Sequence, residues 1–176
     1  MHQGTYNWGV SSQEHKAAGP ASVRVFVLTI SDTRTDETDT GGRSVVDILT
    51  AAGHVVTGKV IVKDDPVHVA NAVGQQAASG AVDVVITTGG TGITRRDSTF
   101  EAIDAMLEKR LPGFGELFRM LSYQEIGSAA MMSRACAGTI GTVVVVSLPG
   151  SAGAVRLAMT RLLIPELGHL VQQAQK

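Results

Sequence analysis

Runs of β-branched residues alternate with segments of helical periodicity along this chain, and that alternation limits the possible folds more than any other feature. Buried strands are expected at 23–30, 55–62, 82–88 and 142–148, because each run is rich in valine, isoleucine or threonine. Helical patterns lie between these runs. A helix that connects two strands returns the chain to the same end of the sheet, so the strands become parallel. The sequence therefore predicts an α/β fold with a parallel sheet covered on both faces.

Capping residues mark where the helices begin and end. Asp65 can accept the first free amides of a helix, and Pro66 suits the first helical position, so a helix is expected from there to Gly80. Ser98, with Glu101 three residues later, forms a capping-box pattern for the helix after the third strand. Glycine or proline ends or divides the other helical patterns, which lie at 45–53, at 114–132 around Gly127, and at 151–170 around Pro165.

Length, charge and cysteine content exclude several classes of protein. The 176 residues suit one domain, expected at 21–176 after a flexible tail at 1–20. The 15 basic and 16 acidic residues give a net charge of −1, which disfavours binding to nucleic acid. No apolar run approaches the ~20 residues that a membrane helix requires, so no membrane location is expected. The single cysteine, Cys136, fits a reducing compartment, and we expect a cytoplasmic protein.

Polar loops with unusual residues follow the expected strands. They contain Ser31 and Asp32 after the first strand, Asp64 after the second, 89–97 after the third, and Pro149, Gly150 and Ser151 after the fourth. In an open parallel sheet, ligands bind beyond the carboxyl ends of the strands. The loops are therefore expected to meet at one edge of the sheet and to form a binding site there.

The stretch Gly89-Gly90-Thr91-Gly92 is the most informative of these loops. Its glycines allow sharp turns that expose consecutive N–H groups, and such groups suit phosphate oxygens. Arg96, which follows closely, can neutralise phosphate charge. The stretch matches neither the dinucleotide-binding fingerprint nor the P-loop. We expect a phosphate-bearing, nucleotide-like ligand here, and the alternative is a tight connection between strand and helix.

Two acidic residues, Asp64 and Asp97, lie in the loops of the same edge. Mg²⁺ prefers a few carboxylates together with substrate phosphates, so the pair could hold this ion. Asp97 could instead only favour the dipole of the following helix. Ser122 and Arg134 lie in the helical region that follows, where each residue alone is better explained by a structural role or by solvation.

A set of motifs extends over most of the chain. It comprises Thr88-Gly-Gly-Thr-Gly92, Arg96-Asp97, Thr99 and Glu101-Ala102, then 112–120, Ser122, 125–127 and 133–135, and finally 148–151 and 165–167. Together these motifs resemble the MoaB/Mog family of molybdenum-cofactor biosynthesis, and the later ones resemble its MoaB branch. The resemblance implies a three-layer α/β sandwich with a mainly parallel sheet, assembled as a homotrimer or homohexamer.

The reaction that the resemblance implies is the transfer of AMP from ATP to molybdopterin, which prepares the product for a MoeA-like molybdenum insertase. Asp64 and Asp97 match the family's catalytic carboxylates, where Mg²⁺ is expected. Positions that match substrate-binding residues are Ser31, Asp32, Gly89, Gly90, Thr91, Gly92, Arg96, Ser122, Arg134, Pro149, Gly150 and Ser151. Two alternatives stay open. One is a non-catalytic molybdopterin-binding or carrier protein, and the other is an interaction subunit that uses the oligomer surface as a scaffold.

Overall fold

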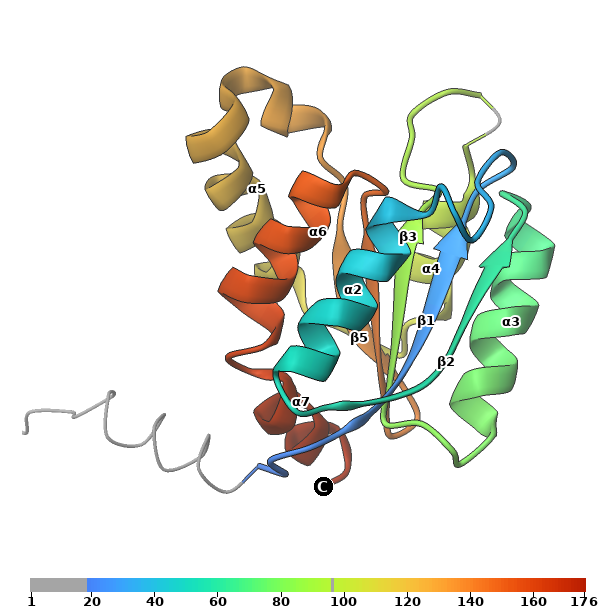
Figure 1. Cartoon of the computed structure of the whole chain (residues 1–176), viewed down its shortest axis with the longest axis vertical. Helices are drawn as coiled ribbons and strands as arrows, with labels where there is room; N and C mark the ends of the chain where they lie inside the picture. The colour runs from blue at the N-terminus through green and yellow to red at the C-terminus, as the bar shows by residue number, and fades with distance from the viewer. Residues whose placement is uncertain (1–18, 96) are drawn as a thin grey trace, which may run out of the picture.

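A six-stranded sheet forms the centre of the protein (Figure 1). The computed structural model describes residues 19–95 and 97–176. The strands are β1 (Arg24–Ile30), β2 (Val55–Val62), β3 (Val84–Gly89), β4 (Lys109–Arg110), β5 (Cys136–Ile140) and β6 (Val143–Leu148). They lie in the order β2-β1-β3-β6-β5-β4, and the first four of these are parallel. The four strands predicted from the sequence are confirmed, and so is their parallel arrangement.

The remaining two strands, β5 and β4, form an antiparallel edge that the sequence analysis did not predict. β5 contains Ala137 and Gly138, which weaken the strand pattern. β4 has only 2 residues, too few to show any periodicity. Gly141 has a φ of 55° and lies between the paired residues Ile140 and Val143. A glycine in such a short connection indicates a hairpin, and this signal could have revealed β5.

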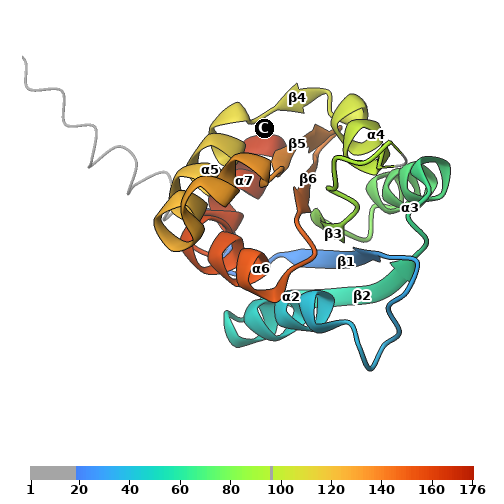
Figure 2. The same cartoon turned by 90° about the horizontal axis from the view of Figure 1, so that it is seen from above.

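Helices cover both faces of the sheet, as Figure 2 shows. They are α2 (Thr40–Ala51), α3 (Pro66–Ala78), α4 (Thr99–Met106), α5 (Pro112–Ile126), the 3₁₀ helix η1 (Gly127–Met132), α6 (Ala152–Ala158), the π-helical η2 (Met159–Leu163) and α7 (Leu167–Ala174). The side chains of α2, α5, α6 and α7 pack on one face, and those of α3 and α4 pack on the other. The expected three-layer sandwich with a mainly parallel sheet is confirmed.

Both helix starts inferred from capping residues are correct, because α3 begins directly after Asp65 and α4 directly after Ser98, but only Asp65 caps its helix with its side chain. Asp65 accepts hydrogen bonds from the amides of Val67 and His68 at 3.0 and 2.9 Å, as expected for the cap of α3. The capping box at Ser98 is wrong, because the Ser98 side chain makes no capping hydrogen bond. Its intended partner, Glu101, forms an ion pair with Arg134 instead.

The core lies on both sides of the central strands. Val27 of β1 packs against the layer of α2 and α5, whereas the next residue, Leu28, packs against the layer of α3 and α4. Both side chains are at most 1% exposed. Strands buried on both faces carry apolar residues at successive positions, which explains the continuous runs in the sequence. Each such side chain contributes roughly 1.5–3 kcal/mol to folding.

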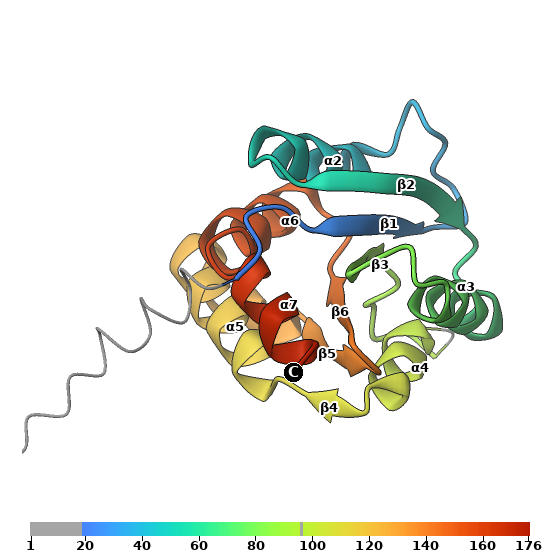
Figure 3. The ribbon, with the colours of Figure 1, turned by 90° about the horizontal axis from the view of Figure 1, so that it is seen from below.

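The first described residues lie at the amino-terminal end of the parallel strands, beside α7 (Figure 3). A Cβ atom added to Gly168 would come within 2.4 Å of the Pro20 carbonyl oxygen, so the two segments are in close contact. Apart from residues 19 and 20, the tail expected at 1–20 lies outside the described residues. No helix within 19–95 and 97–176 is long and apolar enough to cross a membrane.

Candidate active site

Most residues of the expected site lie at the carboxyl ends of the parallel strands, at the top of the sheet in Figure 1. Arg96 lies outside the described residues, while Ser122 and Arg134 come from α5 and from the segment before β5. We name as the strand-end site the residues Ser31, Asp32, Asp64, Gly89–Gly92, Asp97 and Pro149–Ser151. The topology thus gathers loops that are distant in the sequence at a single edge.

Asp64 is held by contacts with two other segments. Its backbone N–H donates to Asp32 Oδ1 at 3.1 Å, and its own Oδ1 accepts a hydrogen bond from Thr99 Oγ1 at 2.6 Å. Thr99 is completely buried at the start of α4, so the Asp64 carboxylate is fixed to a rigid element. Asp32, which the sequence analysis assigned to ligand binding, supports the backbone of Asp64 in the structure.

Gly89 and Gly90 place the loop after β3 directly against β1 and α4. Gly89 has a φ of 99°, and a Cβ atom there would lie 2.2 Å from the Ile30 carbonyl oxygen. Gly90 has a φ of 65°, and its Cβ would lie 3.0 Å from Thr99 Cγ2. Only glycine fits such positions without strain, because other residues rarely adopt a positive φ. The two glycines therefore bring the loop next to the residue that holds Asp64.

Replacing Gly89 with alanine is expected to lower the free energy of unfolding by about 2 kcal/mol or more, because strained backbone and a steric clash would be added together. Thermal unfolding followed by circular dichroism measures the change. Gly153→Ala serves as the matched control, since a Cβ atom at this position of α6 meets nothing within 4 Å. Equal melting temperatures of the two variants would contradict the assigned constraint at Gly89.

Asp97 and Arg134 stabilise the rest of the loop after β3, residues 89–97, which we call the glycine loop. Asp97 Oδ2 accepts a hydrogen bond from the Thr94 amide at 2.8 Å. Arg134 donates from Nε to the Thr91 carbonyl oxygen at 3.1 Å, and from Nη2 to the carbonyl oxygen of Gly92. It also pairs with Glu101. Arg134, which was expected to bind substrate, therefore donates two of its N–H groups to the glycine loop itself.

The environment of Arg134 is shaped by one acidic and one aromatic side chain of α4. The hydrogen bond from Arg134, together with its positive charge, lowers the pKa of Glu101 below its ordinary value. The guanidinium carbon of Arg134 lies 4.6 Å from the centre of the Phe100 ring, within the range of a cation–π contact. Arg134 is therefore fixed from two sides, and through it the glycine loop is tied to α4.

The turn Pro149–Ser151 and Ser122 share one cavity of about 180 Å³. Glu125 and Ser133 also line it, together with apolar side chains of α5 and α6. Ser122 is 5% exposed. In the turn itself, Ser151 Oγ accepts a hydrogen bond from the Ala154 amide at 3.3 Å and so caps α6. The structure thus places Ser122 with the turn, and Arg134 with the glycine loop.

A charged network centred on Asp39, whose side chain is completely buried, was not predicted from the sequence. Asp39 Oδ2 accepts hydrogen bonds from Thr29 Oγ1 and Lys59 Nζ, both at 2.8 Å, and Oδ1 accepts one from the Gly42 amide at 2.9 Å. Burial by itself would raise the pKa of Asp39, but the hydrogen bonds from Lys59, Gly42 and Thr29 outweigh it and lower the pKa. The position of Asp39 just before a helix was the available signal.

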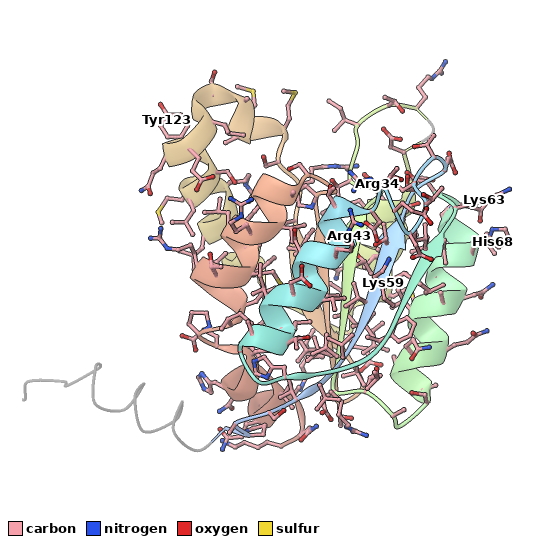
Figure 4. The ribbon with its side chains drawn as sticks, in the orientation of Figure 1. Arg34, Arg43, Lys59, Lys63, His68 and Tyr123 are labelled. Atoms are coloured by element: carbon pink, nitrogen blue, oxygen red, sulfur yellow. The ribbon has the colours of Figure 1, made fainter. Side chains whose placement is uncertain are left out.

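Lys59 is the basic residue hydrogen-bonded to Asp39 in this network, and it comes from β2. Burial favours a lower pKa, but hydrogen bonds to Asp39 and Asp36 outweigh it and raise the pKa of Lys59 above 10.5. Figure 4 shows Lys59 below Arg34 and Arg43, beside α2. Lys59 therefore stays charged at neutral pH and neutralises the buried carboxylate.

The residues of the site suit a metal that arrives with its ligand rather than a metal held by the protein alone. Among residues 19–95 and 97–176, no group of three or more His, Cys, Asp or Glu side chains is arranged to hold a metal ion. Asp64 and Asp97 offer carboxylate oxygens next to the glycine-rich loop. This donor set fits Mg²⁺, which is bound by one or two carboxylates and completes its coordination with substrate phosphates and water.

Cys136 provides no nucleophile. Burial raises the pKa of its thiol to about 12, so the thiolate is scarce at neutral pH. Cys136 is instead partly buried and packs against the part of the core under α3 and α4.

The chain is similar in sequence to proteins of molybdenum cofactor biosynthesis. The family model of the probable molybdopterin binding domain matches residues 26–169. The chain is 56% identical over 162 residues to molybdenum cofactor biosynthesis protein B of Bacillus cereus. The aligned residues cover 92% of this chain and 96% of the relative. These similarities include every loop of the strand-end site.

Solved structures agree with this result. A crystal structure of molybdenum cofactor biosynthesis protein B has a TM-score of 0.86 and 56% sequence identity, over 88% of this chain and 97% of that chain. The tungsten cofactor synthesizing protein MoaB from Pyrococcus furiosus has a TM-score of 0.80 and 38% identity, over 89% and 99% of the two chains.

Proposed function

This chain belongs to the molybdopterin-binding family of molybdenum cofactor biosynthesis proteins, on its MoaB branch, and we propose that it transfers AMP from ATP to molybdopterin with release of pyrophosphate. The observation that carries the proposal is a pair of carboxylates held next to the glycines of the glycine loop, one through Thr99 and one directly. Asp64 is hydrogen-bonded to Thr99, which packs against Gly90. Asp97 lies against Gly92, where an added Cβ atom would be 2.2 Å from Oδ2.

In the proposed reaction, an oxygen of the terminal phosphate of molybdopterin attacks the α-phosphorus of ATP. A new P–O bond forms while the bond from the α-phosphorus to the bridging oxygen breaks, and pyrophosphate leaves with that electron pair. No protein nucleophile takes part. The rate therefore depends on the positioning of the two phosphates and on compensation of their negative charge.

The glycine loop would supply amide donors to these phosphates. Arg134 binds the carbonyl oxygens of Thr91 and Gly92, and in a trans peptide the following N–H points opposite to the carbonyl. The amides of Gly92 and Ile93 are therefore directed away from Arg134. Mg²⁺ that binds with the nucleotide would be held by Asp64 and Asp97 and would neutralise phosphate charge. The two carboxylates would thus fix where the α-phosphate lies.

The test is to mix the purified full-length chain with molybdopterin, ATP and Mg²⁺ and to measure pyrophosphate together with adenylylated molybdopterin. Pyrophosphate release that requires molybdopterin, in equal amount to the adenylylated product, would support the proposal. Controls without molybdopterin and with EDTA separate the reaction from simple ATP hydrolysis. Absence of adenylylated product, with correctly folded protein that binds molybdopterin, would reject the enzyme.

One observation favours the alternative of a non-catalytic molybdopterin-binding or carrier protein. Both carboxylates already have structural contacts, Asp64 with Thr99 and Asp97 with the Thr94 amide. Such contacts would also explain these residues if they only shaped a binding site. Stoichiometric binding of molybdopterin without turnover would favour this alternative.

The proposal includes a homo-oligomer in the cytoplasm, either a trimer or a hexamer, and a MoeA-like molybdenum insertase as the partner that receives the product. Large apolar side chains on α5 and η1 are exposed, among them Met120, Tyr123 and Met131. Tyr123 lies on the outer side of α5 in Figure 4. Exposed apolar clusters of this kind are typical of protein–protein contacts. Light scattering after size-exclusion chromatography would give the oligomeric state, and a monomer would reject this part.

A further inference from the structure

We propose that Arg34 is a positioning residue of the strand-end site, and that its guanidinium holds the turn Pro149–Ser151 in place against the glycine loop. Arg34 lies in the loop between β1 and α2, a segment for which neither the sequence motifs nor the proposed mechanism required an arginine. The inference rests on the proposed function, because the site that Arg34 shapes is the one proposed to bind molybdopterin and nucleotide.

The guanidinium of Arg34 connects the turn to a buried anion. Nη2 donates to the Gly150 carbonyl oxygen at 3.0 Å, and Nη1 lies 3.7 Å from Asp39 Oδ1. The side chain of Arg34 is 29% exposed, whereas that of Asp39 is 0% exposed. Asp39 is immobilised by its own hydrogen bonds, so it fixes the direction of the Arg34 side chain. The turn is thereby tied to the start of α2.

The backbone of Arg34 is anchored as well. Its amide donates to Ser31 Oγ at 3.2 Å, and the Ser31 amide donates to the Val62 carbonyl oxygen at 2.9 Å. Figure 4 shows Arg34 above Lys59, where the strand-end loops meet the start of α2. Ser31, which was expected to bind substrate, thus anchors the backbone of Arg34, whose side chain reaches the turn.

Close packing leaves the turn little room to move. A Cβ atom on Gly150 would lie 3.3 Å from Gly89 Cα, and one on Gly41 would lie 3.0 Å from the Gly150 carbonyl oxygen. Thr88 Oγ1 holds the neighbouring carbonyl, that of Pro149, at 3.1 Å. The turn is therefore in contact with the glycine loop on one side and with α2 on the other. A shift of the turn would change the space beside Gly89.

An arginine suits this position better than a lysine. A planar guanidinium offers several N–H donors in fixed directions, so it can address a carbonyl oxygen and a carboxylate together. A lysine ammonium is a compact charge on a flexible chain and holds such a pair less firmly. Loss of Arg34 would leave Asp39 with its contacts to Thr29, Lys59 and Gly42. We therefore expect the fold to survive while the turn loosens.

The experiment compares Arg34→Gln, Arg34→Lys and Arg43→Gln in the full chain. Arg43 is exposed on the first turns of α2 and supplies a matched loss of one positive charge. Hydrogen exchange of the amides of 150–155 is measured without ligand, and binding of molybdopterin is measured by titration. In Arg34→Gln, the amides of 150–155 should exchange about tenfold faster than in the wild type, because a charge-assisted hydrogen bond is lost. The same variant should bind molybdopterin about tenfold more weakly. Arg34→Lys should fall between, and Arg43→Gln should match the wild type.

The outcomes separate positioning from a general structural role. Faster exchange throughout the sheet, with a lower melting temperature, would overturn the proposal in favour of fold stabilisation. Exchange at the turn that is unchanged in Arg34→Gln would overturn the proposal directly. Equal effects of Arg43→Gln and Arg34→Gln would also overturn it, because the loss of any nearby positive charge would then explain the result. The exchange measurement needs no ligand and no turnover. A chain that binds molybdopterin without adenylylating it would reject the proposed function and leave this test decisive.

Discussion

Asp64→Asn is expected to lower kcat for adenylyl transfer by roughly a hundredfold or more, because it weakens the proposed hold on the Mg²⁺ that neutralises phosphate charge, and losing one electrostatic stabiliser has effects of this size. Asparagine keeps the shape of the side chain and still accepts the hydrogen bond from Thr99. Only the negative charge available to Mg²⁺ is lost. Asp97→Asn should behave in the same way, since the amide oxygen can still accept from Thr94. Initial rates of pyrophosphate release at saturating substrates measure both effects.

Asp65→Asn is the matched control for Asp64→Asn. It removes the same charge one residue further along, and asparagine caps a helix as well as aspartate does, so α3 keeps its start. We expect its turnover to remain close to that of the wild type. Circular dichroism should show the same fold for all three variants. Wild-type turnover in Asp64→Asn would remove this carboxylate from the mechanism.

Asp39→Asn is expected to lower the free energy of unfolding at pH 7 by about 3 kcal/mol, because it breaks a buried ion pair and leaves Lys59 without its main partner. For a chain of this length, such a loss corresponds to a decrease of about 10 °C in melting temperature. Urea denaturation gives the free energy, and calorimetry gives the melting temperature. Asp36→Asn is the control, since Asp36 binds the same lysine with a side chain that is 83% exposed. Its effect should be below about 1 kcal/mol.

The contribution of Asp39 should depend on pH in a defined direction. The pKa of Asp39 in the folded protein lies below its ordinary value of 3.8, so its stabilising effect is complete above that pH and is lost as the pH falls further. The raised pKa of Lys59 has the opposite sign: its contribution is complete below 10.5 and is lost at higher pH. The stability difference between the wild type and Asp39→Asn should therefore diminish in strong acid. A constant difference from pH 7 to pH 2 would contradict the assigned network.

Local sequence patterns predicted most of the fold. The four parallel strands were visible because strands buried on both faces carry continuous β-branched runs. The Asp65 cap was visible because a cap depends only on residues that are adjacent in the chain. Strand β5 was missed because small residues interrupt its pattern, and β4 was missed because it is too short. The capping box at Ser98 failed because Arg134, 33 residues away from Glu101, binds that carboxylate.

The sequence by itself determined the kind of fold and the edge at which the polar loops gather, because both follow from periodicity and from the direction of parallel strands. Only the tertiary structure decided which partner each polar side chain of the site contacts. Asp32 supports Asp64, Arg134 holds the glycine loop, and Arg34 reaches Gly150 over 116 positions of sequence. Such partners are chosen by distances and directions in the folded chain. A local sequence pattern depends only on residues that are neighbours along the chain, so it does not identify these distant partners.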